Sequence, residues 1–188
     1  IEDCSQAHGA IYDNSNLKVG VLGDISVFSL YPGKNLGGIG DGGVVVTENH
    51  KYFNKIKSTR NIGMTEKYIH DYYGGNYRMD SINAIVLDEK LRHIDQWTIK
   101  RQQVALKYMD GITNPKIILP NIEHVEKHAF HIFCLRTNYR LEFISYLKSN
   151  EIEALIHYPE VWYEQKGVDS NIQIISNSNK SVSYSGQI

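Results

Sequence analysis

Alternating apolar and polar positions predict two strands on either side of a glycine-rich loop. Residues 24–30 alternate between two faces, and the β-branched run 44–47 follows the loop, so both segments favour strands. Six of the 11 residues in 33–43 are glycine, which indicates a turn-rich connection. A helix is expected over about 49–59. The local order is therefore strand, glycine loop, strand and helix.

Apolar residues at helical spacing predict a long helix that begins near Asp80. They recur through residues 80–96 and resume at Val104 and Tyr108, with the three- and four-residue intervals of a helix. Asp80 has a short acidic side chain of the kind favoured at an N-cap. We therefore expect one continuous helix over this stretch.

Shorter elements follow in the C-terminal part of the chain. The runs 130–135 and 154–157 favour strands, and 141–149 favours a helix between them. Strands that alternate with a helix are typical of an α/β arrangement. The pattern therefore predicts a small α/β domain.

These elements divide the chain into three parts. Residues 1–110 form the first domain, and Pro115 and Pro120 mark the boundary to a small domain over 111–168. Residues 169–188 are rich in Asn and Ser without a convincing period. Such a composition predicts a weakly ordered end.

The composition excludes several classes of protein. Hydrophobic residues make up 41% and charged residues 22% of the 188 residues, and the formal net charge is -1. No global field is therefore available to gather a polyanion such as nucleic acid. No apolar run approaches the roughly 20 residues of a membrane span. We expect a soluble, cytoplasmic protein with neither a nucleic-acid nor a membrane partner.

The cysteines and histidines give no metal pattern. Cys4 and Cys134 lie far apart in the chain, and both are expected to be small buried residues in a reducing compartment. His8, His128 and His131 lack the spacing of metal ligands. They are interpreted as structural.

The glycine loop carries Lys34, directly after a predicted strand, where its side chain reaches the sheet edge at which α/β proteins usually bind ligands. A P-loop is one alternative interpretation. That motif needs a glycine five positions before Gly33 and Ser or Thr after Lys34, whereas Phe28 and Asn35 occupy those positions. The P-loop interpretation therefore fails.

A dinucleotide-binding loop is the second alternative. Gly38, Gly40 and Gly43 match G-x-G-x-x-G, but that motif must open a helix and the run after it favours a strand. What remains is a lysine whose surroundings suit a covalent cofactor. The Lys34 amine could form a Schiff base, and the Ser29 hydroxyl could bind a phosphate.

Two segments closely resemble a known family of enzymes. They are Ser-Leu-Tyr-Pro-Gly-Lys-Asn-Leu-Gly at 29–37 and Glu-Asp-Cys-Ser-Gln-Ala-His-Gly-Ala at 2–10. The likeness continues through Gly-Gly-Asn-Tyr-Arg-Met-Asp at 74–80 and spans nearly all of 1–159. In these motifs the chain is similar to the DegT/DnrJ/EryC1/StrS family of sugar aminotransferases.

The resemblance implies an α/β fold of the fold type I, aspartate-aminotransferase-like class, with pyridoxal 5'-phosphate (PLP) as cofactor. Residues 1–110 would be the C-terminal part of the PLP-binding large domain, and 111–168 the small C-terminal domain. Family members carry a long segment before the position that matches Ile1. We therefore expect this sequence to start within a longer protein.

The resemblance also assigns roles to four residues around the cofactor. Lys34 would hold PLP as a Schiff base and move a proton between substrate and cofactor. Asp3 would pair with the pyridine nitrogen, Gln6 with the phenolic oxygen and Ser29 with the phosphate. Asp3 could instead be a structural cap, and Ser29 an inward strand hydroxyl.

Four further residues receive roles from the same resemblance. Asn76 would reach across a homodimer interface to the partner's cofactor phosphate, and Arg78 would bind the carboxylate of the amino donor. His157 and Tyr158 would line the sugar-nucleotide pocket. Helix capping near Asp80 is the alternative for the first two, and a short buried strand for the last two.

The implied reaction transfers an amino group from L-glutamate to a keto-sugar nucleotide, with a dTDP-3-keto-6-deoxyhexose as the favoured substrate. The context would be deoxysugar or surface polysaccharide biosynthesis. One alternative is a truncated, catalytically inactive fragment that cannot hold PLP alone. Another is an α/β binding module without covalent chemistry, which would leave the set of Asp3, Ser29 and Lys34 without a purpose.

Overall fold

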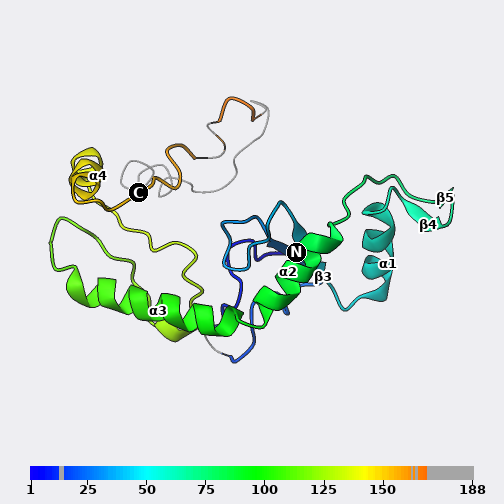
Figure 1. The fold of residues 1–188 in the computed structure, drawn as a ribbon, viewed down its shortest axis with the longest axis horizontal. Helices are drawn as coiled ribbons and strands as arrows, with labels where there is room; N and C mark the ends of the chain where they lie inside the picture. Colours follow the sequence, from blue (N-terminus) through cyan, green and yellow to red (C-terminus); the bar gives the residue numbers. More distant parts are fainter. Residues whose placement is uncertain (13–14, 162, 164, 169–188) are drawn as a thin grey trace. The chain divides into compact units, whose positions relative to one another are not determined.

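The computed structural model describes residues 1–12, 15–161, 163 and 165–168 (Figure 1). The chain forms two compact units. The first consists of Ile1–Leu106 and Glu123–His131, and the second of Lys107–Ile122 and the chain from Ile132 onward. The domain bounds expected from the sequence stay a prediction, and the expected weakly ordered end at 169–188 lies outside the described residues.

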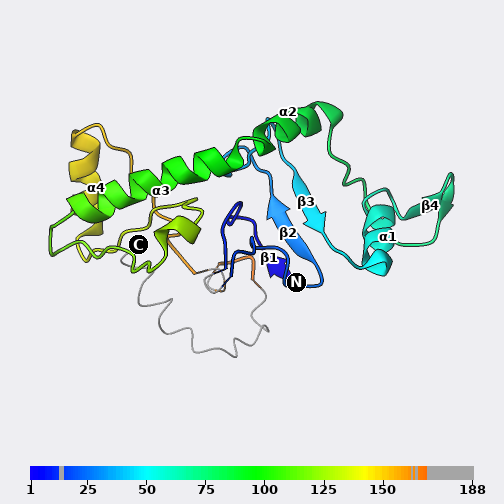
Figure 2. The ribbon, with the colours of Figure 1, turned by 90° about the horizontal axis from the view of Figure 1, so that it is seen from below.

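A three-stranded sheet lies in the first unit, in the order β1 (Glu2–Asp3), β2 (Ser26–Ser29) and β3 (Gly43–Val46). β1 pairs with β2 in parallel, and β2 pairs with β3 antiparallel (Figure 2). The two strands predicted around the glycine loop are thereby confirmed. A dinucleotide-binding loop must open a helix. The glycine loop is instead followed by the strand β3, so the structure excludes that interpretation.

The helix predicted after the second strand is α1 (His50–Thr59). The Asn49 side chain caps it by accepting hydrogen bonds from the Lys51 and Tyr52 backbone N–H groups at 2.9 and 3.3 Å. This is the interaction that makes Asn a favoured N-cap residue. A small antiparallel hairpin of β4 (Met64–Glu66) and β5 (Ile69–His70) follows α1.

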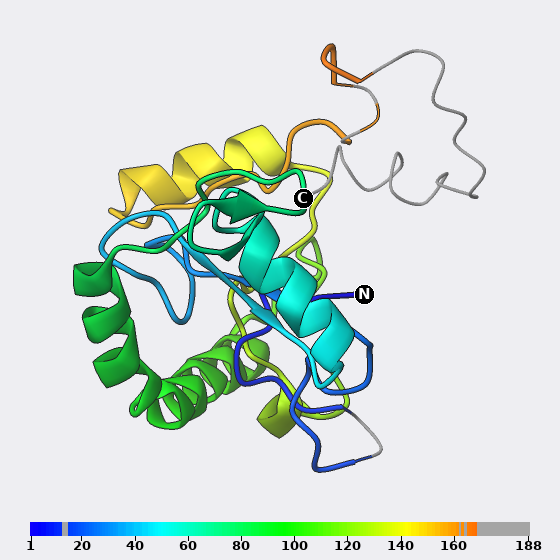
Figure 3. The same cartoon turned by 90° about the vertical axis from the view of Figure 1, so that its right-hand side faces the viewer.

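The prediction of one continuous helix from Asp80 onward is wrong. The structure has α2 (Ser81–Leu91) and α3 (Ile94–Gly111) with a change of direction between them (Figure 3). The Arg92 and His93 N–H groups bond to carbonyls only three residues back, at 3.2 and 3.0 Å. Such tight bonds end an α-helix in a 3₁₀-type turn, and apolar periodicity does not reveal them. Asp80 is the N-cap residue of α2, although its side chain makes no capping hydrogen bond.

In the C-terminal part, the predicted helix is confirmed as α4 (Arg140–Ser149), and a short 3₁₀ helix, η1 (Val125–Lys127), precedes it. The strands predicted at 130–135 and 154–157 are wrong, because neither segment forms a strand in the structure. A strand needs a partner for its backbone groups, and near the first segment the structure gives a single bridge between Ile118 and Arg136.

Burial is limited in the part of the chain that the structure describes. Buried apolar side chains include Leu30, Leu87 and Ile94, which are 3 to 6% exposed. By contrast, Ile82 and Ile85 of α2 are each 70% exposed. Cys4 is buried as expected, but the expectation for Cys134 is wrong, because its side chain is exposed. None of the described helices is both long and apolar enough to cross a membrane.

Candidate active site

The candidate site is built at the carboxyl ends of two neighbouring parallel strands. Asp3 of β1 lies opposite Val27 of β2, and the Cys4 N–H donates to the Val27 carbonyl at 2.8 Å. Carboxyl ends of parallel strands meet at one edge of a sheet. The turn after β1 and the lysine loop after β2 therefore begin side by side.

Asp3 and Lys34 lie within electrostatic reach of each other at this edge. The Asp3 carboxylate accepts a hydrogen bond from the Ser5 backbone N–H at 3.0 Å. Hydrogen bonds from Ser5 and the positive charge of Lys34 lower the pKa of Asp3 below its ordinary value. The side chain is thus an anion near neutral pH, beside the cation of the lysine loop.

The backbone around Lys34 is folded into a turn. The half-buried Lys34 donates its backbone N–H to the Tyr31 carbonyl at 2.9 Å. Leu30, the residue after β2, bonds across the loop to Gly38 and Gly42, each at 2.8 Å. These bonds close the glycine loop and hold the lysine at its start.

Ser29 and Gln6 flank this region. Ser29 is the last residue of β2, and its hydroxyl oxygen accepts a hydrogen bond from the Tyr31 N–H at 3.4 Å. Gln6 is exposed in the turn after β1, where Ala7 N–H bonds back to the Cys4 carbonyl at 3.0 Å. Both side chains belong to the segments that meet at the sheet edge.

His8 lies in the same region, although the sequence suggested only a structural histidine. It is 5% exposed, and its ring centroid lies 5.5 Å from that of Phe28. Burial chiefly lowers the pKa of His8, and the Lys34 charge lowers it further, while the Ser29 backbone acts in the opposite direction. Neither ring nitrogen has a hydrogen bond of good geometry, so the ring is a buried neutral imidazole.

Two buried asparagines hold the lysine loop, and sequence reasoning missed both. Asn35 and Asn83 are 6% and 5% exposed. Asn83 of α2 contacts the backbone of the glycine loop, and Asn35 contacts the segment at 129–131. For Asn83 the sequence carried a signal, namely a polar side chain between the apolar Ile82 and Ile85 of a predicted helix. Such a side chain needs a hydrogen-bond partner if it is buried.

Asn76 and Arg78 follow α1 in an exposed segment of the first unit. Asn76 forms an isolated bridge with Asn61, and the Arg78 guanidinium donates to the Asn61 side-chain oxygen at 2.5 Å. No described contact links either residue to Lys34. His157 and Tyr158 belong to the second unit, with ring centroids 5.3 Å apart.

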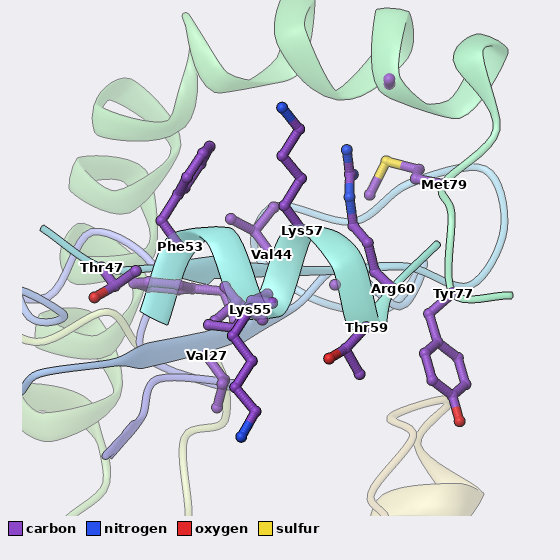
Figure 4. Close-up of a pocket in the computed structure, with 15 residues that line it drawn as sticks. Val27, Val44, Thr47, Phe53, Lys55, Lys57, Thr59, Arg60, Tyr77 and Met79 are labelled. Carbon is purple, nitrogen blue, oxygen red and sulfur yellow. The ribbon is translucent and has the colours of Figure 1, made fainter. Parts of the chain in front are cut away.

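A hollow of about 940 Å³ lies elsewhere in the first unit, between the sheet and α1 (Figure 4). Its walls include Val44 and Val45 of β3, and Figure 4 shows Phe53 and Lys57 of α1, and Arg60 directly after it, projecting to one side. Asp3, Ser29 and Lys34 do not line it. The candidate active site is therefore not this hollow. Among the described residues, no group of three or more His, Cys, Asp or Glu could hold a metal ion.

The donor set at the sheet edge fits PLP. The cofactor presents an aldehyde, a pyridine nitrogen, a phenolic oxygen and a phosphate. Lys34 offers an amine for the aldehyde, Asp3 an anion for the protonated nitrogen, and Ser29 a hydroxyl for the phosphate. Asp3 and the loop that carries Lys34 begin at the same edge of the sheet, because β1 and β2 pair in parallel.

Comparison with known proteins gives the same assignment. The DegT/DnrJ/EryC1/StrS aminotransferase family matches residues 1–184. A dTDP-3-amino-3,4,6-trideoxy-alpha-D-glucose transaminase from Streptomyces venezuelae is 39% identical over 160 residues, which are 85% of this chain and 42% of that protein. A dTDP-3-amino-3,6-dideoxy-alpha-D-galactopyranose transaminase from Aneurinibacillus thermoaerophilus is 42% identical over 166 residues, 88% of this chain and 45% of that protein.

The solved structures agree. The X-ray structure of S. venezuelae DesV in complex with a ketimine intermediate superposes with a TM-score of 0.89 at 34% identity, over 98% of this chain and 49% of that one. The chain thus spans less than half the length of these relatives. The fold is the α/β fold of type I PLP-dependent transferases. The chain belongs to the DegT/DnrJ/EryC1/StrS aminotransferase family, whose cofactor is pyridoxal phosphate.

Proposed function

We propose that the protein containing this chain catalyses PLP-dependent transamination of a keto-sugar nucleotide, with L-glutamate as the amino donor. One observation carries the proposal: β1 and β2 pair in parallel, so that Asp3 and the loop with Lys34 begin at one edge of the sheet, where the Lys34 charge is among the causes that lower the pKa of Asp3. The names of the two bacterial transaminases above, both of dTDP-linked amino sugars, support this substrate class.

The residues of the chain have distinct duties in this proposal. When bound, the cofactor supplies a ring that accepts electrons from the substrate carbon. Asp3, kept anionic by its lowered pKa, holds a proton on the ring nitrogen. Lys34 would hold the cofactor through its aldehyde carbon and, as a free amine, would move a proton between the substrate carbon and the cofactor. Ser29 and Gln6 orient the ring through its phosphate and phenolic oxygen.

The finer assignments extend the same proposal. A dTDP-3-keto-6-deoxyhexose is the favoured acceptor, because the amino sugars in the names of both transaminases carry the amino group at carbon 3. Arg78 would exchange its hydrogen bond with Asn61 for the carboxylate of the donor. Asn76 would complete the phosphate site of a partner in a homodimer. His157 and Tyr158 would contact the sugar nucleotide.

The alternative is that the 188-residue chain cannot hold PLP by itself. Its support is the coverage of only 42 to 45% of the transaminase relatives, together with extensive exposed apolar surface on the described elements. This alternative concerns the isolated chain and leaves the roles of Asp3 and Lys34 in a longer protein unchanged.

Reductive trapping tests the proposal. The protein is incubated with PLP, reduced with borohydride and digested, and the modified lysine is located by mass spectrometry. We expect the adduct on Lys34, its loss in Lys34→Ala and its retention in Lys18→Ala, which removes an exposed lysine paired with Asp95. An adduct that persists in Lys34→Ala would contradict the assignment. Trapping in a full-length protein but not in the isolated chain would favour the alternative.

A further inference from the structure

Asn35, the residue directly after Lys34, uses its side-chain amide in two directions. Its Nδ2 donates to the Ala129 carbonyl at 2.8 Å, and its Oδ1 lies 3.2 Å from His131 Nδ1. Asn35 is 6% exposed, and all of these residues belong to the first unit. A buried amide with both ends bonded has one favourable orientation.

The partners of Asn35 also fix the proton on His131. The Ala129 carbonyl only accepts hydrogen bonds, so Nδ2 must face it and Oδ1 must face the histidine. Nδ1 of His131 therefore carries a hydrogen and donates it to Oδ1. The contact thus has a defined donor and acceptor at each end.

The segment that receives Asn35 is itself anchored to α3. The Arg101 guanidinium donates to the Phe130 carbonyl at 3.1 Å, and the Gln102 amide donates to the Glu126 and His128 carbonyls at 2.8 and 3.1 Å. Phe130 is 4% exposed and has a φ of 42°. A bulky residue keeps such a backbone only where its surroundings impose it. The segment that bonds to Asn35 is therefore itself held in place by hydrogen bonds from α3.

We propose that Asn35 and His131 are positioning residues for Lys34, an inference that rests on the proposed function. With the Asn35 side chain bonded in the protein interior, the neighbouring lysine is limited to a small set of directions, at the edge where Asp3 lies. Without the amide contact, the loop would keep its glycine freedom, and the amine would spend less time where an aldehyde can reach it.

The test compares variants of the pair with a matched asparagine elsewhere in the first unit. Asn35→Ala removes both hydrogen bonds, and Asn35→Asp keeps the size but loses the donor to Ala129. His131→Ala removes one bond, while His131→Asn can restore it, since an Asn amide nitrogen can stand near the place of Nδ1. Asn49→Ala, which removes the cap of α1, is the control.

Two measurements are made on each variant. The first is the rate of borohydride-trapped PLP addition to Lys34, and the second is amide hydrogen exchange of residues 33–41 in protein without cofactor. We expect Asn35→Ala and His131→Ala to slow trapping by about 100-fold and about tenfold, with faster exchange in the loop. In His131→Asn the rate of PLP addition to Lys34 should return to near the wild-type value. In Asn49→Ala that rate should equal the wild-type rate.

The outcomes separate this inference from the proposed function. Wild-type trapping rates and unchanged loop exchange in Asn35→Ala and His131→Ala would overturn the positioning role. If the full-length wild-type protein is not trapped at Lys34, the proposed function fails, and exchange of residues 33–41 alone decides the positioning role. If Asn35→Ala does not fold, the same comparison is made between His131→Ala and His131→Asn, whose equal trapping rates and equal exchange would overturn it.

Discussion

The buried side chain of Asn83 accepts a hydrogen bond from the backbone N–H of Ile39, with Oδ1 3.0 Å from the nitrogen. Its Nδ2 lies 3.3 and 3.4 Å from the carbonyls of Gly40 and Asp41. A Cβ on Gly38 would stand 2.2 Å from the same Oδ1. One helix side chain therefore replaces the backbone partners that a glycine loop lacks.

Replacement of this side chain should destabilise the first unit. Asn83→Ala leaves the Ile39 N–H without its partner, and a lost hydrogen bond of this kind costs about 1 to 3 kcal/mol. We expect that decrease in the free energy of unfolding, measured by urea denaturation. Asn114→Ala, which removes a comparable bond to the Lys116 N–H at an exposed site, should cost less than about 1 kcal/mol. Equal costs would show that the loop does not need Asn83.

The Glu2 carboxylate should make the protein acid-sensitive. Hydrogen bonds from the Tyr12 hydroxyl and from the Gly23, Gly20 and Leu22 N–H groups lower the pKa of Glu2 to about 2. A folded-state pKa below the ordinary value of 4.5 means that its contribution to stability is present above about pH 4.5. That contribution is lost as the pH falls from 4.5 towards 2.

The variant Glu2→Gln tests this linkage. It should melt at a lower temperature than the wild type at pH 7, and the difference should shrink as the pH falls towards 2, because the wild-type carboxylate is then protonated. Melting curves at a series of pH values measure it. Glu66→Gln, at an exposed position in β4, is the control. A difference that stays constant with pH would contradict a role for the charge.

Two glycines should respond to alanine in opposite ways. Gly63 has a φ of 72°, and an added Cβ would lie 1.6 Å from the Tyr72 carbonyl oxygen, so Gly63→Ala should destabilise by more than about 2 kcal/mol. Gly111, the last residue of α3, has nothing within 4 Å of an added Cβ. Gly111→Ala should therefore stabilise by about 0.5 to 1 kcal/mol. Denaturation curves measure both changes, and a loss of stability in Gly111→Ala would contradict the second expectation.

The negative charge of Asp3 should matter for turnover more than for cofactor attachment. Asp3→Asn keeps the shape but removes the anion proposed to pair with the ring nitrogen, so proton transfer from the substrate carbon should slow by about 100-fold or more. Stopped-flow spectra of the half-reaction with L-glutamate measure this step. Trapping on Lys34 should persist in the same variant. Asp24→Asn, at an exposed position before β2, should change neither.

The spacing of apolar and polar residues correctly predicted the elements that depend on interactions between residues close together in the sequence. The strands around the glycine loop and the helices α1 and α4 follow from the spacing of apolar residues, and α1 also begins at its Asn49 cap. The strands expected at 130–135 and 154–157 failed because a strand depends on a distant partner, which apolar composition does not supply.

The same limit applies to the candidate site. Lys34 and Asp3 could be picked out because they stand in motifs with recognisable neighbours. Asn35 bonds to residues 94 and 96 positions away, and Asn83 to residues 42 to 44 positions away. Such contacts are specified by the folded chain rather than by any short segment, so the sequence could mark Asn83 as a polar residue in an apolar run but could not identify the partners of either asparagine.

β3 is an outer strand of the three-stranded sheet, and its three valines, Val44, Val45 and Val46, are each 41 to 46% exposed. An apolar outer strand with open backbone groups is a template for strands of neighbouring molecules. In concentrated solutions of the purified chain we therefore expect fibrous or amorphous aggregates to compete with the monomer. A positively charged gatekeeper such as Val45→Lys should delay their appearance.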